Sequence, residues 1–320
     1  MAADLLTYEN ETPFPVQGPI SKEEFFARRT IIEGIRPVLR LGLGTAFMVG
    51  LEPEGPVETL HTAWRQGFDY ADTAPLYGDA EQLLGLALER WSGDRPVVAT
   101  KTKRTEDVNE VRARFAKSKD SLKSIDLLAV HDAIPEYLPE SRAAISEYIA
   151  GLIQEGEIVA PGLGGGGPQT QAQWLSTGLF KYVITHLRLD PVTLQGLYDS
   201  VPQAQAAGAA VIAASPMHRG LFGPRHSILC DSPPVWLPQV MVERARVVHQ
   251  LALESGIPMS QLAARFVLSM PFVDMVLTGA KSMQEWDDVR IAYEAGPLPQ
   301  DLYTLLWENA CKGAEPQDGG

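Results

Sequence analysis

FDYADTAPLYGDAEQLLGLALERW, residues 68–91, contains a short strand-like run and then a longer amphipathic run. In the second run Leu83, Leu84, Ala87 and Leu88 recur at the spacing of one helical stripe. RPVVATK at 95–101 then supplies another short apolar run, as expected for a strand buried on both faces of a parallel sheet. The segment therefore predicts a strand, a helix and a second strand in succession.

The same alternation continues along most of the chain. Eight strand-like runs are separated by helical patterns or by loops, at 36–44, 68–72, 95–101, 124–132, 157–164, 180–187, 209–217 and 273–280. Right-handed crossovers between eight parallel strands favour closure into a (β/α)8 TIM barrel. An open doubly wound sheet is the alternative, but no GxGxxG follows the first strand, and GLGGGGP at 162–168 lacks the acidic partner of that fingerprint.

Composition limits the classes of partner. Among the 320 residues, 27 Lys and Arg face 40 Asp and Glu, which gives a net charge of −13. This balance argues against nucleic acid and anionic membrane partners. With only two cysteines and no signal peptide, we expect a cytoplasmic protein. We expect an N-terminal extension at 1–28, the barrel at 29–295, and a C-terminal helix and tail at 296–320.

Four polar residues stand at the ends of successive predicted strands. Asp72 ends the second strand, Tyr77 follows it, Lys101 ends the third and His131 lies at the end of the fourth. At the mouth of a barrel these groups can meet, and a lysine beside a phenol favours the phenolate, so we expect acid–base chemistry with the pKa of Tyr77 drawn toward neutral. Taken singly, the aspartate could be a helix cap, the lysine solvated and the histidine structural.

These residues carry a resemblance to the aldo-keto reductase family. ADTAPLYGDAEQLLGLAL at 71–88 resembles its signature, and ATKTKR and LLAVHD resemble its third and fourth strand ends. AGAAVIAASPMHRGLFG at 207–223 is similar to the branch of sugar dehydrogenases acting on galactose or fucose. The resemblance implies a barrel that binds NAD(P)H and interconverts a carbonyl (aldehyde, ketone or sugar lactol) and an alcohol. Tyr77 would be the proton donor, Lys101 and Asp72 would tune it, and His131 would orient the carbonyl oxygen.

The nicotinamide end of the coenzyme site departs from the family pattern. The resemblance places Gly44 and Thr45 of LRLGLGTA near the nicotinamide, together with Ser215 of the seventh strand segment. After the fifth strand, where the family has a Ser-Asn pair, this chain has Gly164 and Gly165 within a run of glycines. The sixth strand region also lacks the aromatic residue that commonly stacks on the nicotinamide.

The adenine end of the site points to NAD(H) over NADP(H). Lys281 and Ser282 match the family's phosphate-binding pair, but Asp287 stands where an arginine often meets the 2′-phosphate of NADP. A carboxylate repels a phosphate and can accept a hydrogen bond from a ribose hydroxyl. Ser282 with Glu285 also reads as an ordinary capping box at the start of a helix, which is compatible with anion binding.

Three functions remain open on the sequence. The first is an NAD(P)-dependent oxidoreductase acting on a small carbonyl or alcohol substrate. The second is a redox-neutral isomerase, cyclase or lyase that uses Tyr77, Lys101 and His131 without hydride transfer, as the altered coenzyme contacts suggest. The third is a regulatory subunit resembling the potassium-channel β subunits. His186, His218 and His226 are candidates for substrate contact, and no spacing resembles a metal site.

Overall fold

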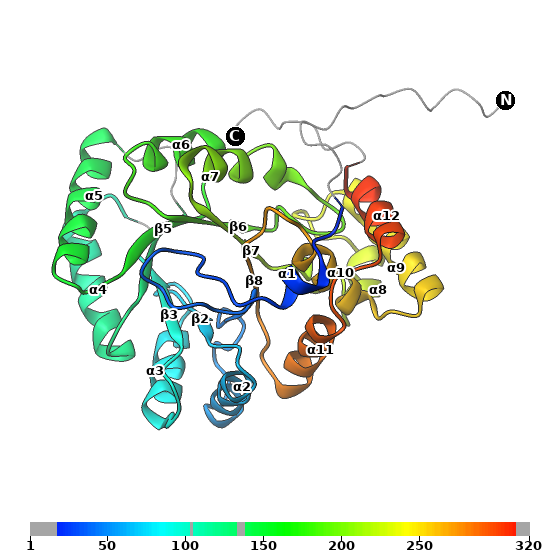
Figure 1. Cartoon of the computed structure of the whole chain (residues 1–320), viewed down its shortest axis with the longest axis horizontal. Coiled ribbons are helices and arrows are strands. Elements are labelled where there is room, and N and C mark those ends of the chain that lie inside the picture. Colours follow the sequence, from blue (N-terminus) through cyan, green and yellow to red (C-terminus); the bar gives the residue numbers. More distant parts are fainter. Residues whose placement is uncertain (1–17, 103–104, 133–137, 312–320) are drawn as a thin grey trace.

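The computed structural model describes residues 18–102, 105–132 and 138–311. Eight parallel strands form a closed barrel in the order of the chain, and the helices surround it (Figure 1). The closing contact pairs β1 with β8 through Leu41 and Val276, which excludes the open sheet. The strands are β1 Leu41–Gly44, β2 Tyr70–Asp72, β3 Val97–Lys101, β4 Leu127–His131, β5 Ala160–Gly164, β6 Tyr182–His186, β7 Ala210–Ala214 and β8 Met275–Thr278.

The predicted (β/α)8 barrel is therefore confirmed. Each strand lies inside one of the eight predicted apolar runs, and the residues left over at the run ends form the connecting loops. The helices after the first five strands are α2 Glu54–Arg65, α3 Ala80–Arg90, α4 Val108–Leu122, α5 Pro139–Gln154 and α6 Pro168–Leu175. The sixth strand is followed by α7 Ser200–Ala207, and the eighth by α11 Met283–Glu294. Between the seventh and eighth strands lie α8 His226–Asp231, α9 Gln239–Ser255 and α10 Met259–Leu268.

The interior of the barrel is filled with side chains, and residues that precede β1 cover the end where the strands begin. Inward-facing strand residues form one apolar cluster with Ile32, Ile35 and Val38, which precede β1. Two tyrosine rings, those of Tyr70 and Tyr182, take part in this cluster. Because active sites of such barrels lie at the carboxyl ends of the strands, closure of the other end leaves one mouth for a ligand.

Two glycines make room for those rings. A Cβ atom at Gly42 would lie 2.8 Å from the Tyr70 ring, and one at Gly162 would lie 2.4 Å from the Tyr182 ring. Such distances are far inside van der Waals contact. Gly42 of the first strand and Gly162 of the fifth strand are therefore required by the packing of the barrel interior.

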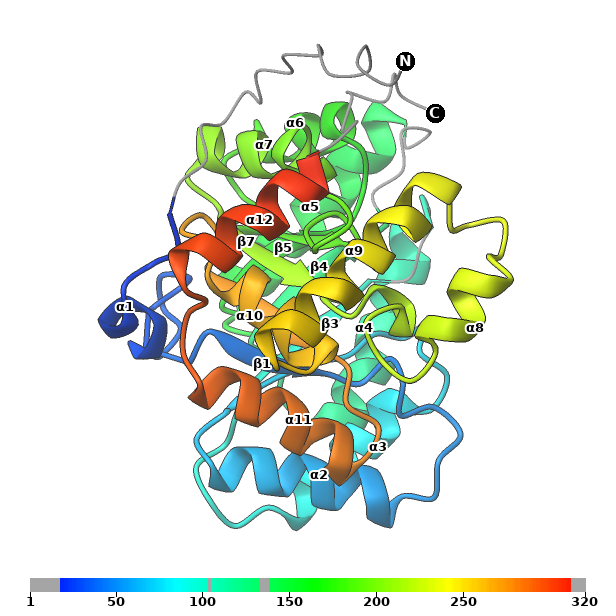
Figure 2. The same cartoon turned by 90° about the vertical axis from the view of Figure 1, so that its right-hand side faces the viewer.

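Both ends of the described chain pack on the barrel. The short helix α1, Lys22–Phe26, begins with a complete capping box between Ser21 and Glu24, and Phe25 is buried 5.3 Å from the ring of Tyr293. At the other end α12, Gln300–Cys311, packs against α9 (Figure 2). Residues 1–17 of the predicted extension and 312–320 of the predicted tail lie outside the described residues. No helix in the described ranges is long and apolar enough to cross a membrane.

Candidate active site

The four polar residues at the strand ends line one cavity. Asp72, Lys101 and His131 are the last residues of β2, β3 and β4. Tyr77 is placed by the turn that follows β2, in which its N–H donates to the carbonyl of Ala74 at 3.0 Å. All four face a cavity of about 360 Å³ at the barrel mouth. The barrel gathers the carboxyl ends of its strands at one mouth, and so brings together residues that are up to 59 positions apart in the sequence.

Lys101 and Asp72 form a buried ion pair. The ammonium Nζ lies 2.5 Å from Asp72 Oδ1 and donates a second hydrogen bond of 2.8 Å to the carbonyl of Thr73. The two side chains are only 4% and 6% exposed. Burial by itself would lower the pKa of Lys101, but Asp72 and Tyr77 together outweigh burial and raise that pKa above its ordinary value. Lys101 is therefore a permanent cation at neutral pH.

Tyr77 lies against both Lys101 and His131. Lys101 Nζ is 5.0 Å from the centre of the Tyr77 ring, and the His131 ring meets the Tyr77 ring edge-on at 5.7 Å between centroids. Burial raises the pKa of Tyr77, and the opposing effect of Lys101 is smaller, so the net direction is upward. This corrects the expectation that Lys101 draws the phenol toward neutral pH. The phenol instead stays protonated, which suits a proton donor.

The residues assigned to the nicotinamide end take different positions. Gly44, Gly164 and Ser215 line the same cavity as the four polar residues. Thr45 is buried, and its N–H and hydroxyl both donate to the carbonyl of Asp72, at 2.9 and 3.2 Å. Gly165, with φ of +99°, lines a small neighbouring cavity. Thr45 therefore holds the end of β2 in place.

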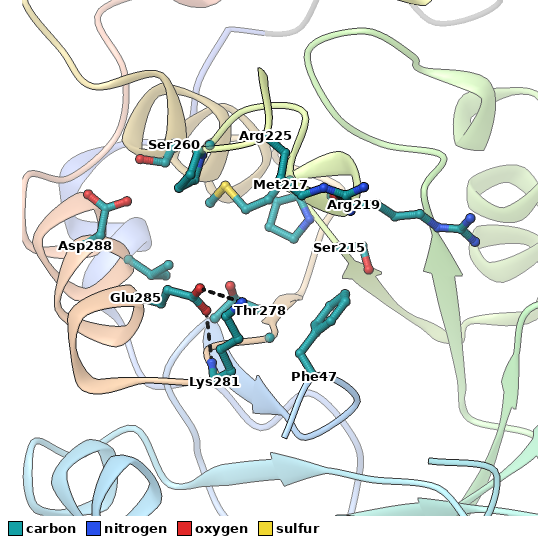
Figure 3. A pocket seen from close by; sticks show the side chains of 16 residues that line it. Phe47, Ser215, Met217, Arg219, Arg225, Ser260, Thr278, Lys281, Glu285 and Asp288 are labelled. Carbon is teal, nitrogen blue, oxygen red and sulfur yellow. Dashed lines mark hydrogen bonds and ion pairs between the residues drawn. The ribbon is translucent and has the colours of Figure 1, made fainter. Parts of the chain in front are cut away.

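A second cavity of about 270 Å³ continues from the first toward α11 (Figure 3). The two cavities together form one groove, because they share five lining residues: Phe47, Ser215, Arg219, Thr278 and Gly279. Lys281 lines the far end of the groove. Ser282 and Asp287 line an adjoining cavity, whose walls also include Glu285 and Asp288 of the groove. The structure therefore places Lys281 in the groove itself and these two residues in the cavity beside it.

The start of α11 is capped differently from the predicted capping box. Ser282 is the N-cap as expected, and its hydroxyl accepts the Glu285 N–H at 3.3 Å. The Glu285 carboxylate, however, accepts the N–H of Lys281 at 3.0 Å instead of that of Ser282. The reciprocal half of the box is thus shifted by one residue, and the carboxylate lies beside Lys281.

Most of the chain resembles known proteins. Residues 40–308 match the model of the Aldo/keto reductase family. The chain belongs to this family. It is 27% identical over 296 residues to a protein named L-galactose dehydrogenase from Arabidopsis thaliana, which covers 82% of this chain and 85% of that protein. A glycerol dehydrogenase structure from Gluconobacter oxydans matches the fold with a TM-score of 0.74 at 22% identity, covering 92% of this chain and 98% of that one.

Aldo-keto reductases typically use NAD(P)H, and the groove fits such a coenzyme. It runs from the cavity that the four polar residues line to a helix N-terminus with a lysine, a setting that attracts phosphate. At Gly164 a side chain would begin 3.4 Å from Lys101 Cδ, so the glycine keeps the floor of the cavity open. Beyond it, Gly165 and Gly166 both have positive φ, of +99° and +97°, and present only backbone where the family has a Ser-Asn pair.

Two further residues line the cavity of the four polar residues. Arg219, in the loop after β7, lines both parts of the groove, and its guanidinium lies 5.2 Å from the Trp236 ring. His186, the last residue of β6, is exposed at the mouth, and partial desolvation together with cations including Arg219 lowers its pKa to about 4, so it is neutral at pH 7. His186 was among the candidates for substrate contact. Arg219 gave no sequence signal beyond its place in the seventh strand segment.

His218 and His226 do not line these two parts of the groove. His218 Nδ1 lies 2.6 Å from Asp190 Oδ2, and His226 Nδ1 lies 3.0 Å from the carbonyl of Leu221. Both side chains are buried and partnered, so both are structural. Across the described ranges, no three His, Cys, Asp or Glu side chains are arranged to hold a metal ion.

Proposed function

We propose that this aldo-keto reductase is an NAD(P)-dependent oxidoreductase that interconverts a small carbonyl compound and an alcohol, with Tyr77 as the general acid and base. The observation that carries the proposal is the position of Tyr77 beside the buried Lys101–Asp72 pair, in a cavity continuous with a groove that reaches Lys281 at the start of α11. The name of the Arabidopsis relative supports a sugar or lactol as substrate.

The chemistry divides between the coenzyme and the protein. The nicotinamide, when bound, supplies or accepts the hydride. In the direction of reduction, Tyr77 donates its hydroxyl proton to the carbonyl oxygen, and the ammonium of Lys101 stabilises the phenolate that remains. Asp72 holds that ammonium in place through the 2.5 Å contact. His131, against the edge of the Tyr77 ring, is positioned to orient the carbonyl oxygen by hydrogen bonding.

The adenine end of the groove supports NAD(H) over NADP(H). Glu285 and Asp288 both line that part of the groove, next to Lys281. Carboxylates there can accept hydrogen bonds from ribose hydroxyls but repel a 2′-phosphate. Cys230 and Cys311 are both free thiols, in keeping with the cytoplasm as the proposed compartment.

The direct test is turnover. The purified protein is incubated with NADH or NADPH and a series of aldehydes and ketones, and with NAD or NADP and a series of sugars and secondary alcohols. A change in nicotinamide absorbance that depends on substrate supports the proposal. Absence of any change across the series, with a correctly folded protein, would refute it.

A redox-neutral reaction on the same residues is the second candidate. It is favoured by one observation, the backbone-only surface at Gly164 and Gly165 where side chains of the family hold the nicotinamide carboxamide. Calorimetric titration separates the two functions. Micromolar binding of NADH or NADPH supports the oxidoreductase, whereas no binding together with isomerisation, cyclisation or elimination of a carbonyl compound supports the alternative.

A further inference from the structure

A carboxylate of the protein occupies the anion-attracting end of the groove. Glu285 Oε2 accepts the backbone N–H of Lys281 at 3.0 Å, and Glu285 Oε1 lies 3.7 Å from Lys281 Nζ. Figure 3 shows these contacts at the lower edge of the cavity, with the Glu285 carboxylate above Lys281. Glu285 therefore uses both the donor and the positive charge that a bound phosphate would need.

The charged residues around Glu285 add to the negative charge at this end of the groove. Asp288, one turn further along α11, lines the groove and accepts a 3.0 Å hydrogen bond from Gln261. The nearest arginine on the helix, Arg290, is held by Asp287 at 3.2 Å and by Glu294 at 2.6 Å. No cation of α11 within the described structure is thus left to face the groove opposite Glu285 and Asp288.

Two arginines stand on the opposite wall, in the loop after β7. Arg225 Nη1 donates to the carbonyl of Arg219 at 3.3 Å, and Arg219 lies over the Trp236 ring. In Figure 3 both guanidinium groups extend along the β7 side, away from Glu285 and Lys281. They can attract the pyrophosphate of a dinucleotide in the middle of the groove without neutralising Glu285 at its end.

We propose that Glu285 is the residue that selects NAD(H) against NADP(H) in this enzyme. The inference rests on the proposed oxidoreductase function and deepens it. A 2′-phosphate carries close to two negative charges and would have to displace the Glu285 carboxylate from Lys281, whereas a 2′-hydroxyl can donate a hydrogen bond to that carboxylate. Like charges brought together in a binding site act as a repulsive specificity element.

Asp287, two residues away, provides a matched comparison. Successive residues of a helix are rotated by about 100°, so positions two apart face nearly opposite directions. Asp287 lines the adjoining cavity but not the one that Lys281 lines, and it pairs with Arg290. Its charge equals that of Glu285, but its carboxylate is held by an arginine, whereas that of Glu285 lies against Lys281.

The test is calorimetric binding of NADH and NADPH to the wild-type protein, E285Q and D287N. Glutamine at this helix position retains an acceptor for the Lys281 N–H, and the ion pair with Lys281 is largely exposed, so E285Q is expected to fold normally. We expect the wild type to bind NADH more tightly. We expect E285Q to bind NADPH roughly 10- to 100-fold more tightly than the wild type does, with NADH affinity changed less than about threefold. D287N is expected to leave the ratio of the two affinities unchanged.

A pair of fragments gives a readout that is independent of the nicotinamide. AMP and adenosine 2′,5′-bisphosphate differ only in the 2′-phosphate, and E285Q should improve binding of the bisphosphate alone. An unchanged NADPH-to-NADH affinity ratio in E285Q, an equal gain in D287N, or a wild type that prefers NADPH would each overturn the inference while leaving the oxidoreductase intact. Failure of every variant to bind either coenzyme would overturn the proposed function together with the inference.

Discussion

His218 Nδ1 and Asp190 Oδ2 lie 2.6 Å apart in a fully buried contact between the loop after β6 and the loop after β7. The second loop carries Ser215 and Arg219, which line the groove. Ser215, His218 and Arg219 all have positive φ, of 64°, 44° and 53°, a conformation that costs non-glycine residues energy. The buried pair is thus placed to hold this strained loop in the shape that forms one wall of the groove.

Stability should fall as pH rises above neutral because of this pair. Burial alone would lower the pKa of His218, but Asp190 outweighs burial and raises the pKa above its ordinary 6.5. A raised pKa in the folded state means that the stabilisation is full below 6.5 and is lost as pH rises through the folded pKa. Urea unfolding of the wild type from pH 6 to 9 should show this loss, and H218N should show a flatter profile. Equal slopes for both proteins would contradict the assignment.

Removing either member of the buried Lys101–Asp72 ion pair should be strongly destabilising, and removing both should cost less than the sum of the two single losses. In D72N the buried ammonium of Lys101 is left without a carboxylate partner, and in K101M the Asp72 carboxylate is left without its cation. Each change should lower the free energy of unfolding by about 3–5 kcal/mol. The double variant should be more stable than the sum of the two losses predicts, by roughly 1–3 kcal/mol. Denaturant unfolding of the four proteins measures this coupling.

An exposed pair provides the control for that cycle. Arg65 and Glu58 lie 2.9 Å apart on α2, with side chains 53% and 56% exposed. The same cycle with R65M and E58Q should give a coupling of less than about 1 kcal/mol, because solvent screens the pair. Similar couplings at both sites would contradict a special role for burial at the Lys101–Asp72 pair.

The sequence predicts the barrel, and the polar residues that meet at its mouth, for a physical reason. Buried parallel strands are apolar on both faces, so each strand is a visible run, and a polar residue at its end stands out as Lys101 does after VVAT. Which cavity a side chain of a surrounding helix lines is harder to predict, because that depends on the elements packed around the helix. The position of Asp287 in the sequence suggested a charge that repels the 2′-phosphate, and the structure adds Glu285, which lies against Lys281 and lines the groove.

The short N-terminal helix shows the same limit. The five residues of α1 are too few to display a helical period, and its burial depends on Tyr293, more than 260 positions away in the chain. Only tertiary contact reveals that Phe25 belongs to the core. Thr45 is similar, since its two hydrogen bonds to the Asp72 carbonyl require β1 and β2 to be paired first.

A methyl group at Gly162 should destabilise the barrel. Its Cβ would lie 2.4 Å from the ring of Tyr182 in the filled interior, so either the ring or the strand must shift. G162A should lower the free energy of unfolding by about 1–3 kcal/mol, as overpacking of cores does. G151A is the control, because a Cβ at Gly151 in α5 meets nothing within 4 Å. That change should be neutral or stabilise by up to about 1 kcal/mol, since alanine favours helix; a loss equal to that of G162A would contradict the packing argument.

Replacement of Tyr77 by phenylalanine should abolish proton transfer while sparing the coenzyme site. Only the hydroxyl of the side chain is removed, and the groove beyond Ser215 is untouched. We expect carbonyl reduction by Y77F to fall about 10²- to 10⁴-fold, with the Kd of NADH changed little. Because burial raises the pKa of Tyr77, the tyrosine should stay protonated through neutral pH, and loss of its proton should slow wild-type reduction only in the alkaline range, above the ordinary value of 10. Turnover by Y77F at the wild-type rate would remove Tyr77 from the mechanism, and loss of NADH binding would show instead that the ring supports the coenzyme.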